Sequence, residues 1–118
     1  MIFGAHIVIY SKDPDADRSF FGSVFGLASV DAGHHWLIFA LPPAEAAIHP
    51  HDRNDVHELY FMCDDLQAEI ANLQKKNVTC SEVQEARWGS ITSVPLPGGR
   101  KVGLYQPKHP IAIAPASS

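Results

Sequence analysis

Residues 6–13 read His-Ile-Val-Ile-Tyr-Ser-Lys-Asp, and residues 57–64 repeat the pattern as His-Glu-Leu-Tyr-Phe-Met-Cys-Asp. Each copy opens with a histidine, continues with residues typical of a strand, and closes on an aspartate. The offset is the same at both ends, since 57 − 6 = 51 and 64 − 13 = 51. Repetition at a fixed spacing indicates a fold built from two copies of one supersecondary unit.

The first copy predicts a strand, a helix and three further strands (βαβββ). Residues 2–11 are rich in β-branched and aromatic side chains, as strands are. Asp13-Pro14 is a typical helix start, with an acceptor at the N-cap and proline in the first turn. Gly26 can supply the left-handed residue that ends the helix. We expect the three following strands at about residues 28–31, 35–41 and 45–49.

The second copy predicts the same order. Its first strand covers about residues 56–63, and Asp64 with Gln67 resembles a capping box for the helix that follows. Leu66, Ile70 and Leu73 form the apolar stripe of this helix, and Asn77 can end it. The last three strands are expected at about residues 78–83, 88–95 and 100–106.

The 118 residues suit one domain. We expect it to span residues 1–107, as a first module (1–51) and a second module (56–107), followed by a C-terminal tail (108–118). A ferredoxin-like βαββαβ order is the main alternative, but it needs only two strands between the helices. Leu27 to Cys63 spans 37 residues (63 − 27 + 1), which leaves room for four strands. The two-module order therefore fits better.

Composition and charge narrow the possible partners. The net charge is −4 and no cluster of Lys or Arg forms a basic stripe, so the footprint of a nucleic-acid-binding protein is missing. No apolar run approaches the ~20 residues of a membrane-spanning helix. No export signal is visible, and the two cysteines do not make a disulfide framework. These features favour a cytoplasmic protein with reduced thiols and a small-molecule partner.

Several motifs together resemble the vicinal oxygen chelate superfamily of glyoxalases, bleomycin-resistance proteins and extradiol dioxygenases. They are the histidine that opens each module, Asp13-Pro14, Phe25-Gly26-Leu27, Pro95-Leu96-Pro97-Gly98-Gly99 and Leu104-Tyr105-Gln106-Pro107. The resemblance covers the chain except its tail. It implies an α+β fold in which two βαβββ modules form an eight-stranded, incompletely closed cup. In that superfamily the cup often holds a divalent metal that chelates the substrate.

The resemblance also implies where metal ligands would lie. His6 and His57 occupy the first-strand positions of the family's metal ligands. The last-strand ligand is usually a glutamate four residues before a proline, and this chain has Gly103 and Ala46 at those places. Neither residue can bind a metal. Glu45 and Glu58 are each one residue from a ligand position, so strand alternation should turn them to the opposite face.

Two classes of function remain open. One is a metal-free or partly metal-binding protein that holds a small, often aromatic molecule. The other is a metal-dependent lyase, isomerase or extradiol dioxygenase, with one Fe, Mn, Zn or Ni ion on His6 and His57. No catalytic residue is assigned. A homodimer is expected in either case, because two modules leave open sheet edges. Residues predicted to line the pocket are Val8, Tyr10, Phe61, Cys63, Trp88 and Tyr105.

Overall fold

The chain folds into two helices and six strands in the part that the computed structural model describes, which is residues 1, 6–47, 49–50, 52, 54, 57–110 and 112. The α+β class is therefore confirmed. The elements are α1 (Pro14–Ser23), β1 (Ser29–Asp31), β2 (Leu37–Phe39), β3 (Tyr60–Met62), α2 (Leu66–Lys75), β4 (Gln84–Ala86), β5 (Gly89–Pro95) and β6 (Lys101–Pro107).

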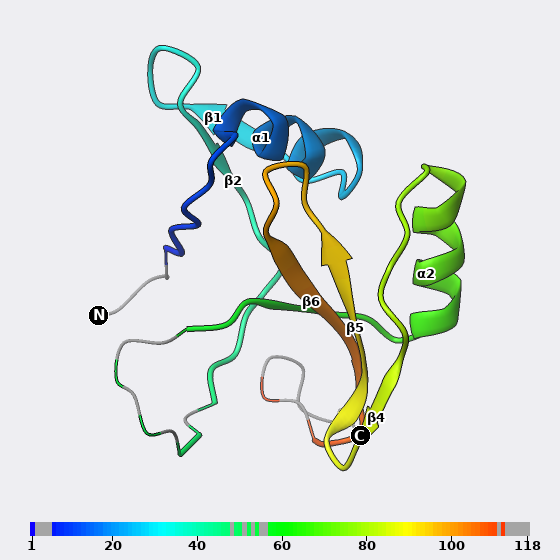
Figure 1. The fold of residues 1–118 in the computed structure, drawn as a ribbon. Coiled ribbons are helices and arrows are strands. Elements are labelled where there is room, and N and C mark those ends of the chain that lie inside the picture. Colours follow the sequence, from blue (N-terminus) through cyan, green and yellow to red (C-terminus); the bar gives the residue numbers. More distant parts are fainter. Residues whose placement is uncertain are drawn as a thin grey trace.

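The second module has the expected βαβββ order. Its four strands form one sheet in the order β3-β6-β5-β4, in which β3 runs parallel to β6 and the other neighbours are antiparallel. The helix α2 follows β3 and packs against one face of the sheet, as Figure 1 shows. The second strand of the module, predicted at about residues 78–83, lies directly after that range, in β4.

The helix α2 starts one residue later than predicted. Asp65, and not Asp64, is the N-cap, because its carboxylate accepts a hydrogen bond from the backbone N–H of Ala68 at 3.1 Å. Asn77 has a φ of 63°, the left-handed conformation expected for the residue that ends the helix.

The first module has its helix and two of its four predicted strands among the described residues. Asp13 caps α1 by accepting from the N–H of Ala16 at 3.2 Å, and Gly26 has a φ of 70°, both as predicted. Strands β1 and β2 pair antiparallel. Among the described residues, however, neither 6–11 nor 45–47 and 49 form a strand. A strand needs a neighbour for its N–H and C=O groups, and these segments pair with no strand of the described chain.

The eight-stranded cup is therefore not seen in the described residues, which form a two-stranded and a four-stranded sheet. The fold is also less compact than one closed domain. Its radius of gyration is 15.3 Å, whereas a compact domain of this length has one of about 13.5 Å.

A single hydrophobic core joins the two modules on the helix-bearing face of the four-stranded sheet. Phe20 and Phe21 of α1 pack with Leu66 of α2 and Val94 of β5. Phe61 of β3 meets the ring of Phe21 at 6.2 Å and that of Phe25 at 5.1 Å between centroids. The helix of the first module thus completes the core of the second.

Neither described helix has the length and apolar character that crossing a membrane requires.

Candidate functional site

The face of the four-stranded sheet that points away from α2 carries a group of aromatic side chains. Along β6, Val102 and Leu104 lie in the hydrophobic core, so strand alternation turns Gly103 and Tyr105 to the opposite face. The register with β3 places Tyr60 beside Gly103 and Met62 beside Tyr105. This face is the one on which the sequence predicts a pocket.

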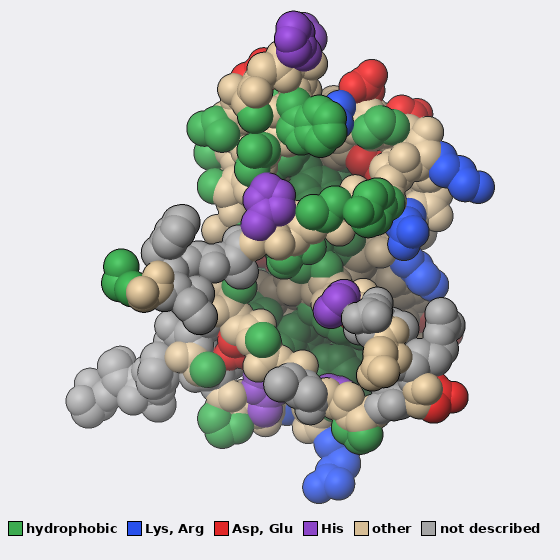
Figure 2. Space-filling view, turned by 90° about the vertical axis from the view of Figure 1, so that its left-hand side faces the viewer, with side chains coloured by type: hydrophobic (Ala, Val, Ile, Leu, Met, Phe, Trp, Pro, Cys, Tyr) green, Lys and Arg blue, Asp and Glu red, His purple; other side chains and the backbone are tan. Residues whose placement is uncertain are grey.

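Three of these rings contact one another and are called the aromatic cluster: Tyr60, Trp88 and Tyr105. Their centroids are 5.7 Å apart for Tyr60–Trp88, 5.7 Å for Tyr60–Tyr105 and 5.2 Å for Trp88–Tyr105, all in edge-to-face geometry. Figure 2 views the molecule from the side opposite α2. It shows hydrophobic side chains at the bottom of a hollow, with histidines on its rim.

Tyr60 occupies the space that a side chain at position 103 would need. A Cβ added to Gly103 would overlap the ring atoms Cγ, Cδ1 and Cε1 of Tyr60. The place where the resemblance implies a glutamate ligand is therefore filled by an aromatic ring from the neighbouring strand. Glycine at 103 is required by this close approach.

The hydroxyl of Tyr60 donates a hydrogen bond to the carboxylate of Glu58. This bond, together with burial and the negative charge of Glu58, raises the pKa of Tyr60 to about 12. Burial, and to a smaller degree the charge of Glu45, raises the pKa of Tyr105. Both phenols are therefore protonated at neutral pH, and the single proton of Tyr60 is used in the bond to Glu58.

The C-terminal tail reaches this face and adds a fourth ring. His109 lies over Tyr105 with an interplanar angle of 28° and 6.0 Å between centroids. Its Nε2 is 3.1 Å from the hydroxyl of Tyr105. Enclosed by these rings, Tyr105 is only 7% exposed.

The structure brings together some predicted pocket residues and separates others. Trp88 and Tyr105 meet in the aromatic cluster. Val8 and Tyr10 are 60% and 76% exposed, so neither side chain is enclosed in a pocket. Phe61 and Cys63 were expected to share the face of the pocket, but they pack against the core on the helix-bearing face. The pairing of Tyr60 with Gly103 sets this alternation, one residue away from the predicted one.

Tyr60 and His109 were not predicted to belong to the site. Tyr60 pairs with Gly103 in the register of β3 and β6, so its side chain lies on the same face of the sheet as the site. The register of the sheet is therefore the signal that identifies it. His109 lies in the tail, where no periodic pattern exists to place it.

The side chains of the described residues do not fit a divalent metal held by this chain alone. His6 and His57 are both exposed. No three His, Cys, Asp or Glu side chains of the described residues come together as a metal site. Gly103 and Ala46 offer no donor atom, and Tyr60 fills the space beside Gly103.

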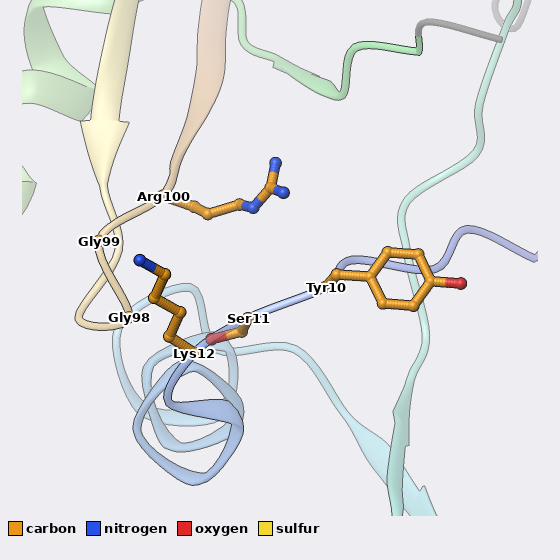
Figure 3. A pocket seen from close by; sticks show the side chains of 6 residues that line it. All are labelled: Tyr10, Ser11, Lys12, Gly98, Gly99 and Arg100. Atoms are coloured by element: carbon orange, nitrogen blue, oxygen red, sulfur yellow. The ribbon is translucent and has the colours of Figure 1, made fainter.

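A separate cavity of about 360 Å³ lies between the N-terminal segment and the β5–β6 turn. It is lined by Tyr10, Ser11, Lys12, Gly98, Gly99 and Arg100. Figure 3 shows Lys12 pointing toward the glycine turn and Tyr10 pointing away from it. The cavity is open, and its charged walls are exposed side chains. The aromatic cluster is the better candidate for a ligand site because its rings are ordered by mutual packing.

Beside this cavity, Asp17 of α1 connects the two modules. Its Oδ1 accepts a hydrogen bond from the backbone N–H of Gly98 at 2.7 Å, and the side chain is buried. A Cβ at Gly98 would lie 2.7 Å from the other carboxylate oxygen, Oδ2. Glycine at 98 therefore allows the turn to approach the helix.

No protein-family model and no curated protein matches the sequence, but several solved structures are similar to this chain. TnmS3, an antibiotic binding protein from Streptomyces sp. CB03234, is 22% identical, with a TM-score of 0.67 over 92% of this chain and 99% of its own. A glyoxalase/bleomycin resistance protein from the same organism is 24% identical, with a TM-score of 0.58 over 81% and 93%.

Lactoylglutathione lyase from Agrobacterium tumefaciens is 19% identical, with a TM-score of 0.58 over 86% of this chain and 90% of its own. An antibiotic binding protein and a lyase therefore share the architecture, so the architecture alone does not select a reaction. This chain has the fold of the vicinal oxygen chelate proteins, the glyoxalase/bleomycin resistance/dioxygenase group.

Proposed function

We propose that this protein binds a small, flat, aromatic molecule at the aromatic cluster and performs no metal chemistry within a single chain. The observation that carries the proposal is the ring of Tyr60 over Gly103, in the place of the carboxylate that a metal centre would need. Three mutually packed rings offer apolar area instead, and the hydroxyl of Tyr105 offers a hydrogen-bond donor. The similar fold of an antibiotic binding protein is consistent with this role.

A titration of the purified chain with flat aromatic compounds tests the proposal. The backbone and indole ¹⁵N–¹H signals report where each compound binds. Trp88 is expected to shift, and Trp36, which is exposed in the first module, serves as the internal reference. Tyr105→Ala should abolish the shift, and Tyr10→Ala should leave it unchanged. A compound that binds and shifts only Trp36 would contradict the proposal.

A metal-dependent lyase or dioxygenase is the second candidate. It is favoured by His6 and His57, which open the two modules, and it needs a third ligand from water, substrate or a partner chain. Metal analysis after reconstitution with Fe, Mn, Zn or Ni decides between the two candidates. A stoichiometric ion that is lost in both His6→Ala and His57→Ala would establish the metal site and refute metal-free binding.

We also propose that the protein is a homodimer in which a second copy covers the first module. Exposed apolar side chains of that module, which the described chain leaves uncovered, favour an interface; they are Ile7, Val8, Val30, Trp36 and Ile38. Sedimentation analysis is expected to give twice the mass of the chain for the wild type and the single mass for Val8→Asp. A monomeric wild type would refute the dimer.

A further inference from the structure

His109 is bound to the aromatic cluster as a ligand would be. Its ring is nearly parallel to Tyr105, whereas the three rings of the cluster meet edge to face. It also makes a hydrogen bond through its Nε2, which is 3.1 Å from the hydroxyl of Tyr105. A planar ring that stacks on an aromatic side chain and is oriented by one polar contact is the usual arrangement in a small-molecule pocket.

The partners of His109 determine the direction of that hydrogen bond. Its Nδ1 is 2.8 Å from the carbonyl oxygen of Pro110, which can only accept, so Nδ1 carries the proton. In the neutral imidazole Nε2 is then an acceptor, and the hydroxyl of Tyr105 donates to it. Tyr105 therefore presents a hydrogen-bond donor to whatever ring lies on it.

The tail is attached by a small number of polar contacts on either side of His109. The N–H of Lys108 donates to the carbonyl of Trp88 at 2.9 Å, and its Nζ pairs with Glu85 at 2.9 Å, where both side chains are about half exposed. On the other side the N–H of Ala112 donates to Glu45 of the first module at 2.6 Å. None of these tail residues belongs to the hydrophobic core, so the tail can leave the face without disturbing the core.

We infer that His109 holds the place of the natural ligand, and that the site takes a planar heteroaromatic molecule with an in-plane hydrogen-bond acceptor, of the pyridine or imidazole kind. The inference rests on the proposed function and adds to it the ligand class and the group that the ligand must displace. The acceptor on the ligand takes the hydrogen bond of Tyr105 in place of Nε2. A ring without such an acceptor leaves the buried hydroxyl unpaired and binds more weakly.

The test uses pyridine and benzene, two flat probes of equal size that differ in one acceptor nitrogen, at a pH where pyridine is neutral. The readout is the indole signal of Trp88, with that of Trp36 as reference. In His109→Ala we expect pyridine to bind about tenfold more tightly than in the wild type, because the competing ring is gone. His109→Ala should prefer pyridine to benzene, and His109→Ala/Tyr105→Phe should bind both alike.

A second variant releases the tail without changing the ring that it carries. Glu45→Ala removes the acceptor for the N–H of Ala112, and it should also tighten pyridine binding. Glu82→Ala makes the same change of charge at an exposed glutamate outside the site and should not. This pair keeps the test valid if His109→Ala folds poorly.

The outcomes separate the two proposals. If neither probe shifts Trp88 in any variant, binding at the aromatic cluster is refuted, and the inference with it. If pyridine shifts Trp88 equally in the wild type, His109→Ala and Glu45→Ala, the site exists but His109 does not occupy it. If His109→Ala binds pyridine and benzene equally, the acceptor requirement is wrong.

Discussion

The two modules repeat one sequence pattern, yet only the second is complete in the described chain. In the second module four strands form one sheet, and Val94 and Leu66 beneath it are 0% and 1% exposed. In the first module two short strands pair, and Val30, at 66% exposed, is one of several apolar side chains in water.

The difference shows what each module contributes. The second module, with α1 laid on it, buries its own core and carries the aromatic cluster. The helix α1 of the first module packs in that core. The rest of the first module has exposed apolar side chains that the described chain does not cover. Stability should therefore depend on the second module and on its contacts with α1, and association should depend on the first.

The largest expected effect comes from removing core volume in the second module. Leu66→Ala should lower the free energy of unfolding by about 2–5 kcal/mol, because it leaves a cavity under the sheet. Val30→Ala should change it by less than about 0.5 kcal/mol in the monomer, because the side chain is already exposed. Urea denaturation of both variants measures the contrast. Equal losses would show that the two modules are equally packed.

The contact between the modules can be broken at Asp17. Asp17→Ala should cost about 1–3 kcal/mol, since the N–H of Gly98 loses a buried partner. Asp17→Asn keeps an acceptor oxygen and should cost less. Asp15→Ala is the control, because Asp15 is exposed and its ion pair with Arg18 is of the surface kind. Thermal unfolding ranks the three, and an Asp15→Ala loss equal to that of Asp17→Ala would contradict the assignment.

A glycine in each module gives a matched comparison of packing. Gly103→Ala should destabilise by about 1–3 kcal/mol because the new methyl group displaces the ring of Tyr60. Gly22→Ala in α1 should stabilise by about 0.5–1 kcal/mol, since its Cβ would meet only a ring atom of Phe39 at 3.8 Å. Adding Tyr60→Ala should remove most of the Gly103→Ala penalty. If Gly103→Ala is harmless alone, Tyr60 does not lie where the structure places it.

The smallest effect concerns the thiol of Cys63. Burial raises its pKa to about 11, so at pH 8 it should react with iodoacetamide roughly a hundredfold more slowly than an ordinary thiol. The folded pKa lies above the unfolded one, so this group's share of the stability is present below about pH 9. It is lost as the pH rises toward 11. Alkylation of a Cys80→Ser chain measures the rate. A rate typical of an exposed thiol would show that Cys63 is less buried than in the structure.

Local sequence signals predicted the helices and the second sheet well. Asp13, Gly26 and Asn77 act through contacts within a few residues, so their roles follow from sequence alone. Asp64 was assigned as the cap in place of Asp65 because either carboxylate could reach an N–H of the first turn. Among the described residues, the first and last strands predicted for the first module are not formed, because pairing depends on a neighbour that a local pattern cannot supply.

The sequence by itself predicted the α+β class, the βαβββ order of the second module and the absence of a carboxylate at Gly103 and Ala46. Only the tertiary structure decided which face of β3 meets the site, because a shift of one residue in register turns every side chain over. It also placed Tyr60 in the space beside Gly103 and His109 on Tyr105. Those contacts join strands 43 positions apart (103 − 60) and bring an aperiodic tail onto the sheet, so no spacing in the sequence could indicate them.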